Sequence, residues 1–134
     1  MIRSSALAPG LQTPGRSLVM APMTANPITG HSLRFKFVDG PVAGKSFDHT
    51  FSRNGHVTFR EVDSDPNAKP GVADQYLVAT LGAECHAVSY LSASGHTLTV
   101  ILDYRTMKLV AFASNEKSLT LQQGTFELLG SAPR

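Results

Sequence analysis

The side chains that could do chemistry in this sequence include five histidines, three tyrosines and one cysteine. Histidine is a common proton carrier near neutral pH and a frequent metal ligand. No two histidines form a His-x-His pair and none lies in a cluster with carboxylates, so we predict no metal site and no cofactor. His49 and His86 are the candidates for a catalytic base. The histidines stand at positions 31, 49, 56, 86 and 96.

Two other motifs receive a structural interpretation. Cys85, the only cysteine, cannot form an internal disulfide and lies in an apolar segment, where we expect a small buried side chain rather than a nucleophile. The stretch DGPVAGKSF, 39–47, has glycines too close together for a phosphate-binding loop, and no helical pattern follows it. Gly40 and Gly44 instead predict a turn between two strands.

Composition and charge limit the classes of function. The chain of 134 residues has the length of one domain, and its 42% apolar and 16% charged residues are typical of a folded protein. The net charge is +2 and the 12 Lys and Arg residues are scattered singly, which does not favour a nucleic-acid partner. No apolar run approaches the roughly 20 residues that cross a bilayer, so no membrane association is expected. Cytoplasmic location is the default expectation, since no signal peptide pattern is present.

The chain divides into three parts. Residues 1–29 are rich in Pro, Gly and Ser and predict a flexible leader, in which Met20 and Met23 are alternative start sites. Residues 30–130 are the expected folded domain, and 131–134 a short tail. From Ser32 onward, short segments with alternating apolar and polar residues are separated by turn signals, which is typical of an all-β sandwich or barrel. We predict eight strands, at 32–38, 46–52, 56–63, 74–81, 84–91, 96–104, 108–115 and 119–129.

The turns indicate how these strands are connected. Asn54-Gly55 lies between two alternating runs and favours a two-residue hairpin turn, and the links at 81–84 and 92–95 are similarly short. Short links make consecutive strands antiparallel neighbours, and closing the sheet removes its two edges. We therefore predict a small eight-stranded antiparallel up-and-down barrel, whose interior holds side chains or one small ligand. The longer loop 64–73 is a candidate lid over one end.

Four segments also resemble a known family. They are FKFVDGPVAGKSFDHTF, NGHVTFREV, VSYLSASGHTLTVILDYRTMKLVAFASNEK and QGTFEL, and together they span about residues 30–129. They are similar to the calycin-like barrels of the molybdenum-cofactor-biosynthesis protein F-like family, and more distantly to the phenolic acid decarboxylases. The resemblance implies a small lipocalin-like barrel.

The resemblance does not extend to decarboxylation. The decarboxylases grip the substrate carboxylate with a Tyr-x-Tyr pair, and the matching positions here are Phe35 and Phe37. Their catalytic acid corresponds to Ser92, and a serine does not donate a proton as a carboxylic acid does. Where the family carries its arginine, this chain offers only Lys69. Three departures at three functional positions argue against this chemistry.

The 46–63 hairpin predicts a set of inward side chains. A turn centred on Asn54-Gly55 would pair His49 with Arg60, on the same face as Phe47. If that face meets Phe35 and Phe37 inside the barrel, Arg60 and His49 would suit an anionic or carbonyl-bearing ligand. Alternatively, Arg60 extends to the barrel mouth and His49 pairs with a backbone group.

The 84–104 hairpin leaves two assignments open. A turn at 92–95 would pair Tyr90 with Thr97, on the face opposite the row Leu98, Val100 and Leu102. In one assignment the Tyr90 face lines a semi-polar pocket and the apolar row packs against a second subunit, giving a homodimer. In the other, the apolar row lies in the core and the threonines face solvent.

The leading functional hypothesis is a barrel that binds a small, partly apolar molecule, anionic or carbonyl-bearing, in its cavity. One alternative is a cofactor-independent isomerase, cyclase or lyase that uses His49 or His86 as base and Arg60 to stabilise an oxyanion. Another is a structural or interaction protein with a filled barrel, which a cavity under about 100 Å³ would favour. The side chains predicted to contact the ligand are Phe35, Phe37, Phe47, His49, Arg60, Tyr76, His86 and Tyr90.

Overall fold

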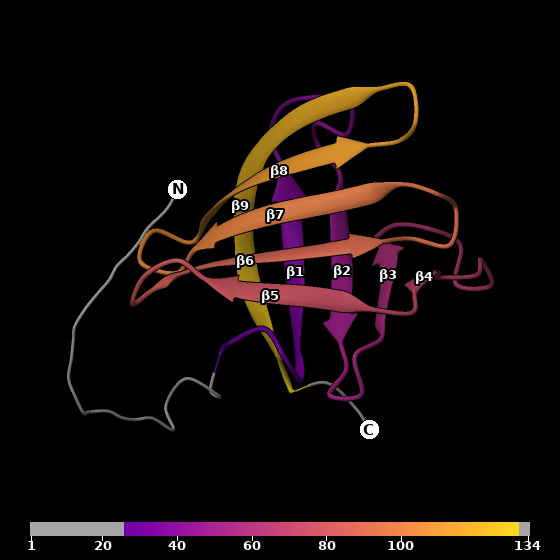
Figure 1. The fold of residues 1–134 in the computed structure, drawn as a ribbon. Helices are drawn as coiled ribbons and strands as arrows, with labels where there is room; N and C mark the ends of the chain where they lie inside the picture. Colours follow the sequence, from indigo (N-terminus) through magenta and orange to yellow (C-terminus); the bar gives the residue numbers. More distant parts are fainter. Residues whose placement is uncertain (1–25, 132–134) are drawn as a thin grey trace.

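The computed structural model describes residues 26–131, and in this range it contains nine strands and no helix (Figure 1). Consequently, none of the described residues belongs to a helix that could cross a membrane. The strands are β1 His31–Phe37, β2 Ser46–Phe51, β3 Val57–Glu61, β4 Gly71–Ala73, β5 Tyr76–Thr80, β6 Cys85–Leu91, β7 Thr97–Asp103, β8 Lys108–Ser114 and β9 Leu119–Ser131.

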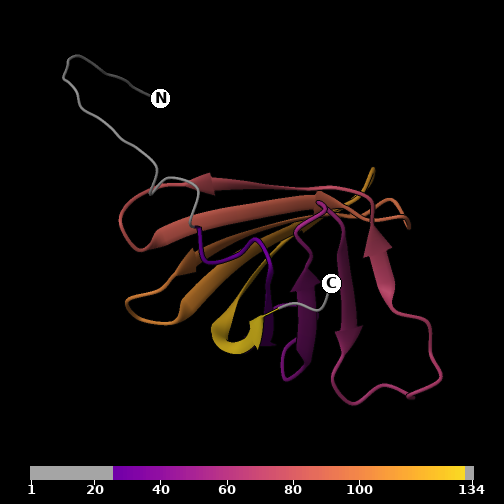
Figure 2. The same cartoon turned by 90° about the horizontal axis from the view of Figure 1, so that it is seen from below.

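These strands form one antiparallel sheet that is nearly closed into a barrel. Its order is β4-β3-β2-β1-β9-β8-β7-β6-β5, so consecutive strands are neighbours and β9 returns to pair with β1. Strands β5 to β8 form one layer that crosses β1 to β4 at a steep angle (Figures 1 and 2). Near the edge strands β4 and β5, single backbone bonds join the two layers. Ala93 N, in the turn between β6 and β7, donates to the carbonyl of Val72 on β4 (2.9 Å), and Tyr76 N on β5 donates to that of Gly55 in the turn between β2 and β3 (3.1 Å).

The all-β prediction is confirmed, and each of the eight predicted segments contains a strand. The ninth, β4, lies in the stretch expected to be a loop. Two prolines and a glycine in this stretch predict a loop, and the strand Gly71–Ala73 is too short to show an alternating pattern. It pairs with β3, where Ala73 is opposite Val57. Since β4 is an edge strand, Pro70 can precede it without breaking a ladder on its outer side.

Alternating side chains of the strands meet in one core. On β1 the inward residues are Leu33, Phe35 and Phe37, and all three are buried. The row continues on β2, where Phe47, His49 and Phe51 point the same way. On the other layer the core comprises Val88, Tyr90, Val100, Leu102, Leu109 and Ala111. His49 is therefore a polar side chain within an aromatic row, which makes its hydrogen bonds important.

A glycine allows the barrel to close between β1 and β9. A Cβ atom on Gly124 would lie 1.9 Å from the backbone carbonyl oxygen of Lys36. No side chain fits at that distance, so the close pairing of Phe37 with Gly124 requires glycine.

The ordered fold begins before the expected end of the leader. Ile28 is fully buried, and the Asn26 side chain accepts hydrogen bonds from the backbone N of Ile28 (2.9 Å) and of Thr29 (2.8 Å). At the other end, β9 continues through Ser131. The rest of the predicted leader, 1–25, and of the predicted tail, 132–134, lies outside the described residues.

Both hairpins used to assign the faces differ from the predicted register by one residue. The first loop is Arg53-Asn54-Gly55, closed by Ser52 N to the carbonyl of His56 (2.9 Å), with Gly55 at φ 97°. The loop thus has three residues and not the predicted two. As a result His49 pairs with Phe59, and Arg60 lies on the outer face opposite Asp48.

The second hairpin is also shifted by one residue, because a three-residue loop, 93–95, replaces the predicted four-residue turn, 92–95. Ser92 N bonds to the carbonyl of His96 (2.7 Å), and Gly95 has φ 91°. Tyr90 consequently pairs with Leu98, so that it shares the inner face with the row Leu98, Val100 and Leu102. The apolar row therefore lies in the core, as the second assignment predicted, but Tyr90 lies inside with it, as the first predicted. This row cannot form a homodimer interface.

Candidate functional site

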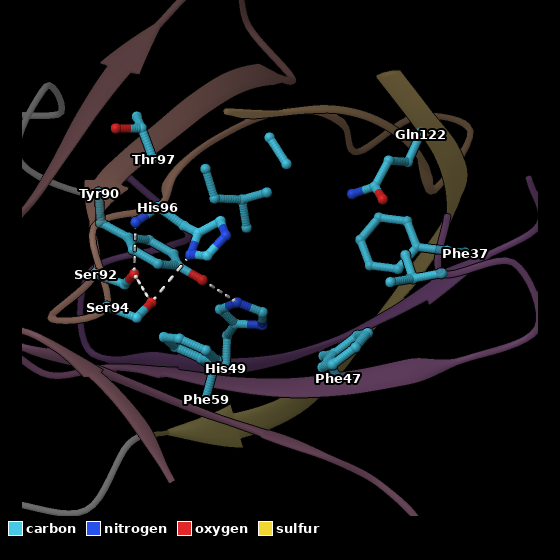
Figure 3. Close-up of a pocket in the computed structure, with 13 residues that line it drawn as sticks. Phe37, Phe47, His49, Phe59, Tyr90, Ser92, Ser94, His96, Thr97 and Gln122 are labelled. Carbon is cyan, nitrogen blue, oxygen red and sulfur yellow. Dashed lines mark hydrogen bonds between the residues drawn. The ribbon is translucent and has the colours of Figure 1, made fainter. Parts of the chain in front are cut away.

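A pocket of about 200 Å³ opens at one end of the barrel. Its wall is mostly aromatic and aliphatic, with polar groups from the turn between β6 and β7 and from β9 (Figure 3). Its volume exceeds the bound below which a filled barrel would be favoured. The lining residues are Phe37, Val42, Phe47, His49, Phe59, Tyr90, Ser92, Ser94, His96, Thr97, Leu98, Ala113 and Gln122.

The most distinctive feature of this pocket is a buried pair formed by His49 and Tyr90. Nε2 of His49, on β2, lies 2.7 Å from the hydroxyl oxygen of Tyr90, on β6 (Figure 3). The two strands belong to different layers and are 41 residues apart in sequence. Phe35 packs on the imidazole with a ring-centroid distance of 4.5 Å, and Phe59 stacks on it at 5.4 Å. Aromatic packing thus fixes the ring orientation.

Burial keeps both members of the pair neutral. Desolvation lowers the pKa of His49 to about 3, although the backbone of Phe47 and the charge of Asp48 oppose the shift. Desolvation also raises the pKa of the Tyr90 hydroxyl above its ordinary value. At neutral pH the pair is therefore an imidazole beside a phenol, and it carries no net charge.

One nitrogen of His49 has no partner. Nδ1 is buried, and among the described residues no group completes a hydrogen bond to it, although the Phe47 backbone lies close enough to raise the pKa of the ring. If the Tyr90 hydroxyl donates to Nε2, then Nδ1 carries the proton and is a free donor. If Nε2 donates, the Tyr90 hydroxyl proton is free instead. In either tautomer the pair has one unused donor and an unused acceptor.

Phe59 reaches the pocket because of a glycine on the neighbouring strand. A Cβ atom on Gly71 would lie 2.1 Å from the Phe59 ring, so the ring occupies the space that a side chain at 71 would need. Phe59 also stacks on Tyr90 with a centroid distance of 5.4 Å. The short strand β4 therefore contributes to the site by making room for this aromatic wall.

The rim carries a chain of hydrogen bonds with a defined direction. The Asn115 Oδ1 atom accepts bonds from Lys117 N (2.8 Å) and Ser118 N (2.9 Å), which fixes the amide and turns its NH₂ group toward His96 Nε2, 3.4 Å away. Nε2 then accepts, so the neutral ring carries its proton on Nδ1 and donates to Ser94 Oγ (3.1 Å).

The chain ends at Ser92. Ser94 Oγ lies 2.8 Å from Ser92 Oγ, which also accepts from His96 N (3.2 Å). Either hydroxyl can donate in this contact. Where Ser94 donates, Ser92 receives two bonds and its own proton is free for a further acceptor. Ser92 is buried and lines the pocket, which makes this proton available there.

Gln122 provides a polar group on the far wall. It lies on β9, is buried, and among the described residues its side-chain amide has no hydrogen-bond partner (Figure 3). The loop between β1 and β2 is tied to the same strand: Gln123 N donates to Asp39 Oδ1 (2.6 Å). This bond holds the loop that carries Val42 against the pocket.

Four of the predicted ligand contacts lie together in this pocket, namely Phe37, Phe47, His49 and Tyr90. Phe35 is fully buried behind them and packs on His49. The structure thus brings the predicted aromatic cluster to one end of the barrel.

The other three predicted contacts lie elsewhere. The prediction that Arg60 points inward is wrong: its Nη1 donates to the carbonyls of Ala68 (2.8 Å) and Asp65 (3.4 Å) in the outer loop, because the register is shifted by one residue. The Tyr76 hydroxyl donates to the Ser52 carbonyl (2.6 Å), which helps to join β5 to the first hairpin. His86 is buried away from the pocket, with Nδ1 3.1 Å from Thr80 Oγ1.

Sequence reasoning missed the polar rim and Phe59. Phe59 was missed because the predicted register, which turned Arg60 inward, placed Phe59 on the opposite, outer face. Ser92 was considered only as the residue that replaces the acid of the decarboxylases. The signal for the rim is the repeated pattern Ser-x-x-Gly-His, at 52–56 and 92–96, which marks both three-residue loops. The candidate lid 64–73 contributes no residue to the lining of this pocket. Within residues 26–131, no group of three or more His, Cys, Asp or Glu side chains could hold a metal ion.

Comparison with known proteins supports the fold. No protein-family model matches the chain, and no curated protein matches it. A similar solved structure is the crystal structure of "a putative beta-lactamase from Burkholderia vietnamiensis". Its TM-score is 0.63 at 14% sequence identity, and the match covers 78% of this chain and 97% of that chain. At this identity, the likeness shows that the two chains share a fold and nothing more.

Proposed function

We propose that this protein binds a small neutral molecule, with one or two rings and a carbonyl or hydroxyl group, in the pocket beside His49 and Tyr90. The observation that carries the proposal is the unpartnered Nδ1 of His49, a buried polar atom of a residue that lines a mostly apolar cavity. Leaving such an atom unpaired costs about 1 to 3 kcal/mol, which a ligand carbonyl or hydroxyl would offset.

The size of the pocket limits the ligand. A dry apolar cavity of about 150 Å³ accepts benzene. A pocket of about 200 Å³ with aromatic walls therefore suits a molecule with one or two rings. Polar groups at two ends, the His49–Tyr90 pair and the Gln122 amide, favour a ligand with two hydrogen-bonding groups.

Charge argues for a neutral ligand. The expectation of an anionic ligand depended on Arg60 in the cavity, and its guanidinium binds loop carbonyls on the outside. Among the described residues that line the pocket there is no Lys or Arg, and the imidazole of His49 is neutral. An anion in this pocket would lose its hydration without a cation to compensate.

A hydrolytic activity is the second candidate, because Ser94 and His96 lie 3.1 Å apart and the similar solved structure is described as a beta-lactamase. A serine nucleophile needs a histidine nitrogen that accepts its proton. Here the Asn115 amide holds His96 in the tautomer that donates to Ser94. This direction favours binding over hydrolysis.

The resemblance to the molybdenum-cofactor-biosynthesis protein F-like family stays part of the proposal. What supports it is the nearly closed antiparallel barrel with a polar group deep in an open cavity, an arrangement in which lipocalin-like barrels hold one small ligand. Membership of this family would be compatible with a binding function, because the tyrosines of the decarboxylases are replaced here by Phe35 and Phe37.

A thermal-shift experiment with benzamide and benzoate tests the proposal. The two probes have nearly the same shape and differ in charge, so we expect benzamide to raise the melting temperature and benzoate to leave it unchanged. Ala113→Phe, which fills the pocket, should abolish the effect of benzamide, whereas Ala68→Phe in the exposed loop should preserve it. Equal shifts from both probes, or a shift that survives Ala113→Phe, would contradict the proposal.

A further inference from the structure

The outer face of β5 to β9 is unusual for a surface in contact with water, because its central rows carry no charge. One row crosses all five strands, from Leu77 through Ser89, Thr99 and Phe112 to Leu121. The flanking rows are Ala79, Ala87, Ile101, Val110 and Gln123 on one side, and Leu91, Thr97, Ser114 and Leu119 on the other. This face, which we call the uncharged face, is turned toward the viewer in Figure 1.

The rest of the barrel surface provides an internal comparison. The outer face of β1 to β3 carries Arg34, Lys36, Asp48 and Arg60, and Arg34 forms a salt bridge of 2.7 Å with Asp48. The same chain therefore places charges on one exterior sheet surface and excludes them from the central rows of the other. Exclusion of charge from the centre of a patch is characteristic of a protein interface.

The large apolar side chains of the uncharged face are well exposed. Leu77, Leu91, Phe112, Leu119 and Leu121 are between 40% and 75% exposed. With roughly 200 Å² for a fully exposed side chain of this size, they leave about 600 Å² uncovered. A standard interface covers about 800 Å² on each partner, so these residues and their smaller neighbours are sufficient for one.

The polar groups on this face are already satisfied. The hydroxyls of Ser89 and Thr99 lie 2.7 Å apart and bond to each other across β6 and β7. They would lose little when water is removed from the face. Charged residues appear only at its ends, for example Asp103 and Lys108 at one end and Glu116 at the other, which is the arrangement of a polar rim around an apolar centre.

We propose that the uncharged face binds a second copy of this chain, so that the protein is a homodimer with its two β5–β9 sheets packed face to face. A twofold contact uses the same patch on both copies, and two uncharged patches do not repel one another. The face offers no charge that would steer a different protein partner or bind an anionic lipid headgroup. The shallow hollow beside Leu77 and Leu91 can receive a projecting side chain of the other copy.

Sedimentation of the full-length chain tests this proposal. We expect twice the mass of the 14.3 kDa monomer. Phe112→Glu and Leu121→Lys should each weaken dimerisation about 30-fold or more, whereas Thr58→Glu on the charged outer face should leave it unchanged. Circular dichroism will check that each variant is folded. Because two different substitutions are used, the test still works if one of the two variants does not fold.

Three results would overturn the proposal. The first is a wild-type chain that stays monomeric at the highest attainable concentration. The second is a dimer that both folded variants leave intact, which would place the interface elsewhere. The third is a monomer that sediments with neutral phosphatidylcholine vesicles, which would assign the uncharged face to a lipid surface.

Discussion

The hydroxyl oxygen of Tyr90 lies 2.7 Å from Nε2 of His49, and this contact joins the two layers of the barrel at the wall of its pocket. Both groups are buried and neutral, and both come from strands whose other inward side chains are largely apolar. A polar pair in this position constrains the fold, because each member leaves the other unsatisfied when it is removed.

Tyr90→Phe should therefore destabilise the protein by about 1 to 3 kcal/mol in urea unfolding, because it leaves a second His49 nitrogen buried without a partner. Tyr104→Phe is the matched control. The Tyr104 hydroxyl is also buried, burial raises its pKa to about 12, and within residues 26–131 it has no hydrogen-bond partner to lose. Its removal should change stability by less than about 0.5 kcal/mol. If both variants lost the same free energy of unfolding, the hydrogen bond between His49 and Tyr90 would not contribute to stability.

The pKa of His49 predicts a pH dependence of stability. The folded pKa of about 3 lies below the ordinary value of 6.5, so between these values the unfolded chain binds a proton that the folded chain does not. The stabilising effect of the neutral ring is complete above about pH 6.5 and is lost as the pH falls toward 3, by about 1.4 kcal/mol per pH unit.

Unfolding measured at several pH values from 7 to about 4 checks this slope. His49→Gln removes the titration, and its amide can still bond to Tyr90. Between about pH 4 and 6.5, the free energy of unfolding of the variant should therefore vary less steeply with pH than that of the wild type, by about 1.4 kcal/mol per pH unit. The contributions of carboxylates stay the same in both proteins. An identical slope in the wild type and in His49→Gln would mean that His49 accepts a proton in the folded state.

Arg60→Ala should not affect ligand binding. Its guanidinium holds the loop 64–70 through the carbonyls of Asp65 and Ala68, so the variant should speed amide hydrogen exchange in that loop. Benzamide affinity should stay within about twofold of the wild type. As a matched control, Arg34→Ala removes the salt bridge to Asp48 and should leave exchange in 64–70 unchanged. A large loss of benzamide affinity in Arg60→Ala would restore the inward assignment of Arg60.

Gly124→Ala should prevent the barrel from closing. The added methyl group would lie 1.9 Å from the Lys36 carbonyl oxygen, and only a shift of the β1 or β9 backbone could relieve the clash. We expect a loss of at least about 3 kcal/mol, or no folded protein. Gly82→Ala is the control, because a Cβ atom added there would have nothing within 4 Å and the φ of Gly82 is not in the left-handed region. Circular dichroism and thermal melting distinguish the two, and a folded Gly124→Ala of normal stability would contradict the assigned contact.

Much of the fold could be predicted from the sequence, because alternation and turn residues are local signals. All eight predicted strands are present, and their antiparallel order follows from the short links. Which side chains of a strand point inward could not be predicted as reliably, because it depends on the number of residues in each loop. The predicted turns had two residues in the first hairpin and four in the second. The pattern Ser-x-x-Gly-His at 52–56 and 92–96 encodes three, with Gly55 and Gly95 at positive φ. A slip of one residue then moved Arg60 inward and Phe59 outward.

The site was predicted in part for the same reason. Phe37, Phe47 and His49 were placed correctly because the alternation on their own strands sets the face, independently of the partner strand, whereas the face of Tyr90 was left open between two assignments. Gln122 could not be recognised, since the polar pair Gln122-Gln123 occupies both faces of β9 and either member could point inward. The contact between His49 and Tyr90 depends on how the two layers cross, and no local pattern records this.

The most direct test of the account is the NMR signal of the His49 ring nitrogens during titration with benzamide. We expect the ring to show the neutral pattern at pH 6, and its Nδ1 resonance and the Tyr90 ring signals to shift with saturation as benzamide is added. The Ala113→Phe variant should show neither shift. A charged imidazole at this pH, or benzamide shifts confined to residues outside the pocket, would contradict the proposal that His49 and Tyr90 hold a neutral ligand.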